Sequence, residues 1–402
     1  MNKMNKINIT TILEKIKKRN LYQNILNIEG VRDPIFNFDR LNITADKIYV
    51  RFESLGLSVE EQKFTVEGFD GTFRNIEATL KNSQTNSDKY MVLTSHYDTV
   101  PNTVGANDNA SAIALQFEIA RILTEEDLNL NVKFVSFSLE ELNPFLVKQG
   151  ILKGQELGLK DAQNRISSYH FKQIRKKMND LYSQLQSEGI SGEEITKRSI
   201  ATLKPEMTTK EIEYYSYFQS LYPTKEGFDS VGFDGFIGSS HWVDQNKDNV
   251  NQIKFVFNFD EIAFTSKKKY SHHIPEGIPV SQFPQYKLQL EDQIGDFIIL
   301  FSDDKSEWML GSLFKNAEAI DLPYLGFPTQ MNYNTIKKQL PQMLAADHAP
   351  FWRAGIPCIF VSDMGEYRSP YAHTMADTID TLDFDFLKKV TQMTLATLLE
   401  NL

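Results

Sequence analysis

The alternation of apolar and polar residues predicts an α/β fold built on a mixed, mostly parallel central sheet with helices on both faces. Residues 90–96 and 132–139 are nearly continuous apolar runs, and residues 110–126 between them carry apolar side chains at helical spacing. A strand that is apolar throughout is typical of a sheet covered on both faces. The two strands are therefore expected to run parallel and to be joined by a right-handed crossover through the helix.

The remaining pattern divides the chain into an α/β part and a helical part. Residues 142–235 read as helices of mixed charge that are rich in Tyr and Gln, and alternating strands and helices resume at residue 236. With 402 residues the chain exceeds the usual size of a single core. The sequence thus predicts one α/β domain, residues 1–141 and 236–402, interrupted once by a helical insertion, residues 142–235. Further helices are expected at 1–20, 43–57, 235–246, 306–320 and 385–402, and further strands at 58–67, 72–82, 253–264, 296–303 and 355–363.

Composition and charge exclude several classes of protein. Apolar residues make up 41% and charged residues 24% of the chain, which is ordinary for a globular protein. The formal net charge of -10 argues against a nucleic-acid partner, because binding to the phosphate backbone needs a basic surface. No apolar run approaches the roughly 20 residues that span a bilayer, and the lysine-containing start lacks a signal-peptide pattern. No membrane partner and a cytoplasmic location are therefore expected. The single cysteine, Cys358, stands in an apolar run, as a buried inert thiol does.

Acidic residues and a histidine lie at the ends of three predicted strands, at the edge where ligands bind in α/β sheets. They are His96 and Asp98 at the end of one strand, Glu140 and Glu141 at the end of a second, and Asp260 toward the end of a third. Successive strand residues point to opposite faces, so one glutamate is expected to bind a ligand and the other to face a substrate. Imidazole and carboxylate donors without a thiolate fit Zn²⁺, with Mn²⁺ or Co²⁺ as substitutes.

Each of these features also has an ordinary structural explanation. A His-x-Asp pair at a strand end is more often a hydrogen-bonded surface pair, and an acidic pair often interacts with a helix dipole. Asp108 could simply cap the helix that follows it. The joint occurrence favours a metal, because unpaired acids gathered at one sheet edge would repel one another strongly without a cation.

Six segments stand in a fixed order along the chain. They are HYDTVPNTVGANDNASAIALQFEIARIL from residue 96, VKFVSFSLEE from 132, GFIGSSHWV from 235, NFDEIAF from 258, DHAPFWRAGIPCIFVSD from 347 and YAHTMADTIDTLD from 371. In this order they resemble the motifs of the co-catalytic di-zinc aminopeptidase family. The family's zinc exopeptidase (phosphorylase/hydrolase-like) fold also serves glutaminyl cyclases.

The resemblance implies a role for each matching residue. Five residues are implied as ligands of two zinc ions: His96 and Asp260 hold one, Glu141 and His373 hold the other, and Asp108 bridges the two. Glu140 would be the general base, and Asp98 would accept the second ring N–H of His96 and fix its orientation. The peptide bond between Asp108 and Asn109 is implied to be cis.

The implied reaction is hydrolysis of the N-terminal peptide bond of short peptides by a water that bridges the two metals, with Glu140 moving the proton. Two alternatives stay open: a single-zinc glutaminyl cyclase, which is an acyltransferase, and a catalytically inactive binding protein of the same fold. The DNAS helix start fits the peptidases better than the cyclases, and the complete ligand set argues against a loss of catalysis. Short peptides are the expected partners, and a homo-oligomer is an open alternative.

The largest departure from the family's pattern is the insertion. In typical members the Gly-Ser helix comes within a few residues of the Glu-Glu pair, whereas here residues 142–235 intervene. Because it follows Glu141 directly, the insertion is expected at the rim of the active site, as a helical lid or as a dimerisation arm. Asp347 and His348 are expected to have a supporting role near the substrate, and His272 is expected in a solvated loop.

Overall fold

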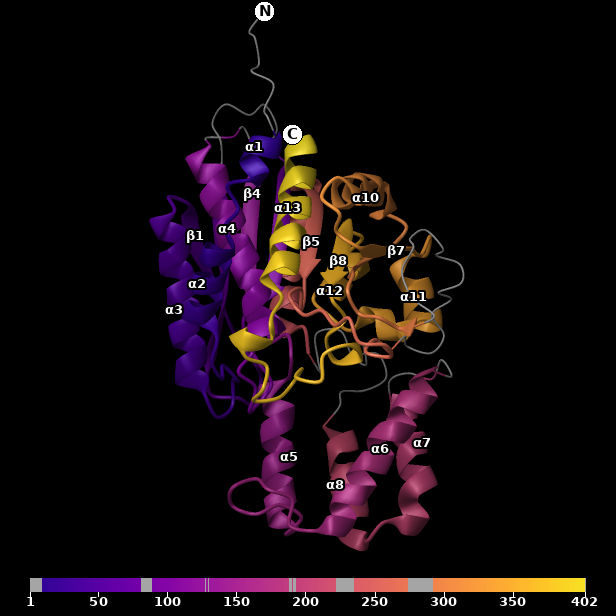
Figure 1. The fold of residues 1–402 in the computed structure, drawn as a ribbon. Helices are drawn as coiled ribbons and strands as arrows, with labels where there is room; N and C mark the ends of the chain where they lie inside the picture. Colours follow the sequence, from indigo (N-terminus) through magenta and orange to yellow (C-terminus); the bar gives the residue numbers. More distant parts are fainter. Residues whose placement is uncertain are drawn as a thin grey trace, which may run out of the picture.

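A mixed sheet forms the centre of the α/β body (Figure 1). The computed structural model describes residues 9–80, 89–126, 128, 130–187, 190, 193–221, 235–273 and 292–401. Within these residues the sheet has eight strands in the order β1-β2-β4-β3-β5-β8-β6-β7. The strands are β1 (Ser58–Thr65), β2 (Thr72–Leu80), β3 (Tyr90–His96), β4 (Val132–Phe137), β5 (Ile253–Phe259), β6 (Ile298–Ser302), β7 (Tyr324–Pro328) and β8 (Cys358–Ser362).

The strands at the middle of the sheet run parallel. β3 pairs in parallel with β4 and with β5, β5 with β8, and β6 with β7. The pairs β1–β2, β2–β4 and β6–β8 are antiparallel. The predicted parallel pair is confirmed in a register that runs from Met91 opposite Val132 to His96 opposite Phe137. The predicted fold class is therefore confirmed.

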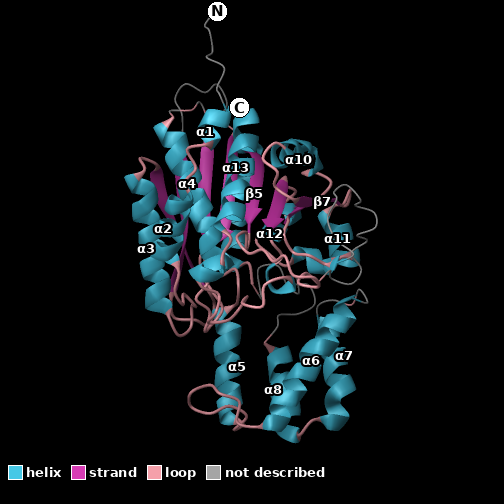
Figure 2. Cartoon of the chain, in the orientation of Figure 1, coloured by secondary structure: helices cyan, strands magenta, loops and turns pink. Residues whose placement is uncertain are grey.

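Helices cover both faces of this sheet, because the strands are apolar on both sides. On β3, Leu93 belongs to one apolar core and its neighbour Val92 to another. The first core contains α2 (Lys18–Ile28), α3 (Phe38–Ser54), α4 (Ser111–Glu125), α10 (Leu310–Glu318) and α13 (Phe384–Glu400). The second contains α9 (Ile237–Gln245), α11 (Tyr333–Gln339) and α12 (His348–Arg353). α13 crosses in front of the strands in Figure 2.

Several elements differ from the predictions. The helix expected over residues 1–20 is, in its described part, a short α1 (Ile9–Leu13) followed by α2. The backbone N–H of Lys17, between the two helices, donates to the Glu118 side chain of α4 at 3.1 Å. This tertiary hydrogen bond takes the place of the backbone hydrogen bond that a continuous helix would make. Strand β7 was not predicted, because Gly326 and Pro328 weaken its local signal. The parallel pairing with β6 stabilises this strand, although its own sequence does not favour one.

The chain after Glu141 forms four helices that pack among themselves: α5 (Pro144–Glu156), α6 (Tyr169–Ser187), α7 (Glu193–Leu203) and α8 (Thr209–Ser220). Asn143 starts α5 by accepting the backbone N–H of Phe145 at 2.9 Å, with a proline at the first helical position. Two small apolar clusters lie inside the group, separate from the cores of the sheet. Figure 1 shows the four helices together below the α/β body.

The placement of these helices leaves the role of the insertion a prediction. α6 contacts the short 3₁₀ turn Pro341–Leu344 of the α/β body, which agrees with a position at the rim. The boundaries 142–235 and a role as lid or dimerisation arm stay predictions. Among the described residues, no helix is both long enough and apolar enough to cross a membrane.

Candidate metal centre

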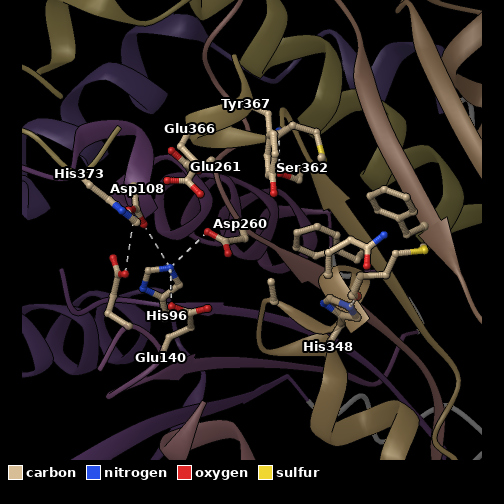
Figure 3. Close-up of a pocket in the computed structure, with 17 residues that line it drawn as sticks. His96, Asp108, Glu140, Asp260, Glu261, His348, Ser362, Glu366, Tyr367 and His373 are labelled. Atoms are coloured by element: carbon tan, nitrogen blue, oxygen red, sulfur yellow. Dashed lines mark hydrogen bonds and ion pairs between the residues drawn. The ribbon is translucent and has the colours of Figure 1, made fainter. Parts of the chain in front are cut away.

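The predicted donors meet at the carboxyl edge of neighbouring parallel strands. His96 is the last residue of β3, Glu140 and Glu141 follow β4, and Asp260 follows β5. Because β3 pairs with both β4 and β5, the ends of these strands bring the donors together. Figure 3 shows His96 at the centre of the group, with Asp260 and Glu140 facing it. Nε2 of His96 lies 3.2 Å from Oδ1 of Asp260 and 4.0 Å from Oε2 of Glu140.

Asp108 lies between the two histidines. It belongs to a short irregular turn, Ala106–Ala110, that connects the loop after β3 to α4. Its Oδ1 is 3.3 Å from Nε2 of His96, and its Oδ2 is 3.3 Å from Nε2 of His373. The bond from Asp108 to Asn109 is cis, as the resemblance implied. Burial by itself would raise the pKa of Asp108, but the hydrogen bonds from His373 and His96 hold this pKa below its ordinary value.

The donors form two groups that share Asp108. One group is His96, Asp108 and Asp260, and the other is Asp108, Glu141 and His373; within each, donor atoms lie within 4.8 Å of one another. A further group, His96 with Glu140 and Glu141, also meets this limit. Nε2 of His373 lies 3.5 Å from Oε2 of Glu141, and the His373 side chain is 45% exposed. The site therefore opens to solvent on the His373 side.

Glu140 points into the same space from a buried position. Burial is the main reason that the pKa of Glu140 stands well above its ordinary value, and the neighbouring carboxylates Asp260 and Glu141 raise it further. A cation in the site would lower this pKa again. The carboxyl group thus faces the donors from a position where its protonation responds to the charge in the site, as a general base requires.

Asp98 is buried and contacts two parts of the site. Nδ1 of His96 lies 3.3 Å from the backbone carbonyl oxygen of Asp98 and 3.5 Å from Oδ1 of its carboxylate, so the role that the resemblance implied for the carboxylate stays a prediction. The same carboxylate also accepts the backbone N–H of Glu140 at 3.1 Å and of Glu141 at 3.3 Å. Asp98 therefore positions the backbone of both glutamates as well as the imidazole ring of His96.

Sequence reasoning missed a second aspartate of this kind. Asp377 accepts the backbone N–H of Asn107 at 3.0 Å and of Asp108 at 3.1 Å. Burial raises the pKa of Asp377 to about 7. It stands four residues after His373 in a segment that was singled out for its resemblance, but nothing in the local pattern shows that it contacts the turn of Asp108.

A cavity of about 190 Å³ extends from the donors toward an apolar wall. Its charged lining includes Glu261 and Glu366, which are outside the metal-binding groups and were not predicted. His348 lines it, as expected, while Asp347 beside it is buried, and burial raises the pKa of Asp347 to about 7. His272, expected in a solvated loop, is instead buried and packs edge-on against Phe297 with ring centroids 5.0 Å apart.

The donor set fits a small divalent cation. Imidazole nitrogen and carboxylate oxygen are ligands that Zn²⁺ accepts. Burial alone would lower the pKa of His96, but the charge of Glu140 and the hydrogen bond with Asp108 raise it well above its ordinary value. Such a shift indicates a strongly negative potential, which a cation would offset. Oε1 of Glu141 is buried and has no hydrogen-bond partner among the described residues, so it is available to a ligand.

Adding Zn²⁺ to chelator-treated protein is expected to raise its unfolding temperature. A ligand at 100 times its dissociation constant stabilises the folded state by about 2.7 kcal/mol. With an unfolding entropy of about 2.1 cal/mol/K per residue, this corresponds to roughly 3 °C for a chain of 402 residues. Scanning calorimetry with Zn²⁺, and with Mg²⁺ as the control, measures the shift. An unfolding temperature that does not respond to Zn²⁺ would contradict a metal site made of these residues.

The sheet, its helical layers and the donor groups at its carboxyl edge are those of the zinc exopeptidase-like class of α/β folds. Comparison with protein families gives a narrower assignment. The chain belongs to peptidase family M28, whose model matches residues 75–229 and 224–398. The resemblance found in the sequence is thereby confirmed.

Individual relatives are more distant. Aminopeptidase YwaD of Bacillus subtilis (strain 168) is 25% identical over 227 residues, which are 56% of this chain and 43% of that protein. The chain thus spans less than half the length of this curated relative. The solved structure of BSAP, a zinc aminopeptidase from Bacillus subtilis, has a TM-score of 0.57 at 14% identity and covers 96% of this chain and 95% of its own. Glutaminyl cyclase of Porphyromonas gingivalis has a TM-score of 0.53 at 16% identity, over 97% of this chain and 100% of its own. At these identities the two structures establish the fold alone.

Proposed function

We propose that the protein is a zinc-dependent exopeptidase that removes the N-terminal residue of short peptides. The supporting observation is the charge of the cavity. Beyond the metal-binding groups, its lining carries the carboxyl side chains of Glu261 and Glu366, and none of the described residues that line it is a lysine or an arginine. A substrate ammonium group would be attracted to such a lining, whereas a free substrate carboxylate would find no cationic side chain there.

The proposed ligands keep the roles that their positions suggest. His96 and Asp260 would hold one zinc ion, Glu141 and His373 the other, and Asp108 would contribute one oxygen to each. When bound, zinc supplies Lewis-acid chemistry and makes a coordinated water more acidic. Mn²⁺ or Co²⁺ could serve as a substitute.

Glu140 is the residue that transfers the proton in this proposal. Its carboxylate accepts a proton from the attacking water and delivers it to the departing amine, so one buried group serves both steps. Asp98 supports this by holding the backbone N–H of Glu140 and of Glu141. The positions of the base and of the neighbouring proposed ligand are thus fixed by a single carboxylate.

The apolar part of the cavity lining favours an apolar side chain at the substrate's N-terminus. This part consists of Phe301, Met343, Phe360 and Met364, which belong to or pack against one apolar core. Burying an apolar side chain against them contributes roughly 1.5–3 kcal/mol. Leucine or methionine at the first position of a peptide therefore suits the cavity better than a charged residue.

Blocking the amine of a substrate is expected to reduce hydrolysis strongly, while blocking its carboxyl end is not. A charge-assisted hydrogen bond contributes about 1.5–3 kcal/mol, so N-acetylation of a leucyl tripeptide should lower kcat/KM by at least roughly 10-fold to 100-fold. C-terminal amidation of the same peptide is the matched control, and chromatography of the products measures both. Faster cleavage of the acetylated peptide, or release of the C-terminal residue, would overturn the proposal.

The likeness of the fold to a glutaminyl cyclase keeps a single-zinc acyltransferase as the second candidate. The sharing of Asp108 between two donor groups favours two metals instead. Metal content and an N-terminal glutaminyl peptide separate the candidates. One zinc per chain with conversion of the peptide to its pyroglutamyl form would establish the cyclase. No reaction with any peptide in the presence of zinc would favour an inactive binding protein.

A further inference from the structure

Arg32 lies outside the residues matched by the family model, yet its side chain reaches the loop behind the metal centre. It follows α2, and its side chain is 0% exposed. Nε donates to the carbonyl of Tyr97 at 2.7 Å, Nη1 to that of Val104 at 2.9 Å, and Nη2 to that of Gly105 at 3.0 Å. The remaining side-chain bonds go from Nη1 to the carbonyls of Gly30 at 2.8 Å and Ile28 at 3.4 Å.

These bonds fasten both ends of the segment that carries Asp98 and Asp108. Tyr97 immediately precedes Asp98, while Val104 and Gly105 come just before the turn of Asp108. The backbone N–H of Arg32 adds a bond to the hydroxyl of Thr99 at 3.0 Å. One planar guanidinium thus holds carbonyl groups that are seven and eight residues apart in the sequence.

Gly105 shows how closely the loop fits around this group. Its φ of +69° lies in the left-handed region, where a side chain is disfavoured. A Cβ at this position would come within 2.7 Å of Nη2 of Arg32 and 2.4 Å of the carbonyl oxygen of Asp108. The absence of a side chain therefore lets the guanidinium and the turn of Asp108 approach one another.

The charge of Arg32 stands among acidic residues of the site. Burial lowers its pKa to about 10, and the charges of Asp108, Asp377 and Asp98 counteract that shift. The guanidinium is therefore ionised at neutral pH. The side-chain hydrogen bonds of Arg32 go to backbone carbonyls. The guanidinium therefore acts on the carboxylates by holding their backbone and through the electric field of its charge.

We propose that Arg32 is a positioning residue of the metal centre. It fixes the backbone that carries Asp98 and Asp108, and its positive charge offsets part of the repulsion among the carboxylates behind the site. The inference rests on the proposed zinc site. Groups that orient metal ligands are typically worth about 10-fold to 100-fold in metal affinity, so the expected effect is on zinc binding and not only on stability.

Two substitutions separate the hydrogen bonds from the charge. Arg32→Lys keeps a positive charge but loses the planar fork, whereas Arg32→Met loses both. Competition of the chelator-treated full chain with a fluorescent zinc chelator measures affinity. We expect Arg32→Met to bind zinc about 100-fold more weakly than wild type and Arg32→Lys about 10-fold more weakly. Ile25→Ala, in the buried face of α2, is the matched control and should lower the unfolding temperature while zinc affinity stays at the wild-type value.

The outcomes separate this inference from the proposed function. Wild-type zinc affinity in folded Arg32→Met and Arg32→Lys would overturn the role of Arg32 while the zinc site stands. A wild-type chain that binds no zinc would overturn the proposed function itself. If Arg32→Met fails to fold, the zinc affinities of Arg32→Lys and Thr99→Val test the inference. Thr99→Val removes the acceptor of the Arg32 backbone N–H, and unchanged zinc affinity in both variants contradicts the inference.

Discussion

Replacing Glu140 by glutamine is expected to abolish peptide hydrolysis while the protein keeps its zinc. Glutamine has nearly the same shape, but its amide cannot accept the proton of the attacking water. A general base contributes roughly 100-fold to 10,000-fold to the rate, so kcat should fall by that factor. Turnover of a leucyl tripeptide, together with metal content by mass spectrometry on the same samples, measures the two properties separately.

The control for Glu140→Gln is Glu53→Gln, an identical change at an exposed position of α3. It should match the wild type in both rate and zinc content. Loss of zinc in Glu140→Gln would point to the third donor group, in which Glu140 stands with His96 and Glu141. A rate within a few-fold of wild type would show that another group moves the proton.

Replacing Asp108 by asparagine is expected to remove zinc as well as activity. Asp108 is the residue that the two proposed sites share, with one carboxylate oxygen facing His96 and the other facing His373. Asparagine has no charge and offers a single oxygen, so at most one site keeps an oxygen donor from this residue and neither keeps an anionic one. The loss of zinc affinity should exceed the roughly 10-fold to 100-fold effect of groups that only orient ligands.

Zinc titration of Asp108→Asn beside Asp39→Asn, an exposed aspartate of α3, tests this expectation. The control should bind two zinc ions per chain, as the wild type is proposed to do. Two tightly bound zinc ions in Asp108→Asn would contradict the bridging role. One zinc ion in the wild type, with cyclisation of a glutaminyl peptide, would favour the cyclase alternative.

The elements that the sequence predicted well are those with a strong local pattern. β3, β4 and α4 are apolar enough to be recognised without their neighbours, and their order predicted the parallel pair correctly. β7 contains Gly326 and Pro328 and exists because β6 offers it a hydrogen-bonding edge. The break between α1 and α2 depends on Glu118, which is 101 residues away from Lys17 in the sequence.

The residues of the candidate site likewise fall into those that the local sequence predicted and those that it did not. His96, Glu140, Glu141 and Asp260 could be grouped from the sequence, because residues that end adjacent parallel strands lie at one edge of a sheet. His373 and the bridging role of Asp108 came from family resemblance, and the structure brings both residues to the same edge. Glu261 gave no signal of its own beside Asp260 in the predicted strand 253–264, and Glu366 gave none because a single acid between predicted elements is usually solvated.

The sequence by itself determined the order of the strands and helices with a strong local pattern, the family, and the chemical types of the donors at the sheet edge. Only the tertiary structure decided how those donors are held. Asp377 binds the backbone of Asp108 across 269 residues of sequence, and Arg32 binds the carbonyl of Tyr97 across 65. Their partners are backbone N–H and C=O groups, which are chemically the same at nearly every position. A sequence therefore carries no local mark of such contacts, and they become visible when the folded chain brings the two segments together.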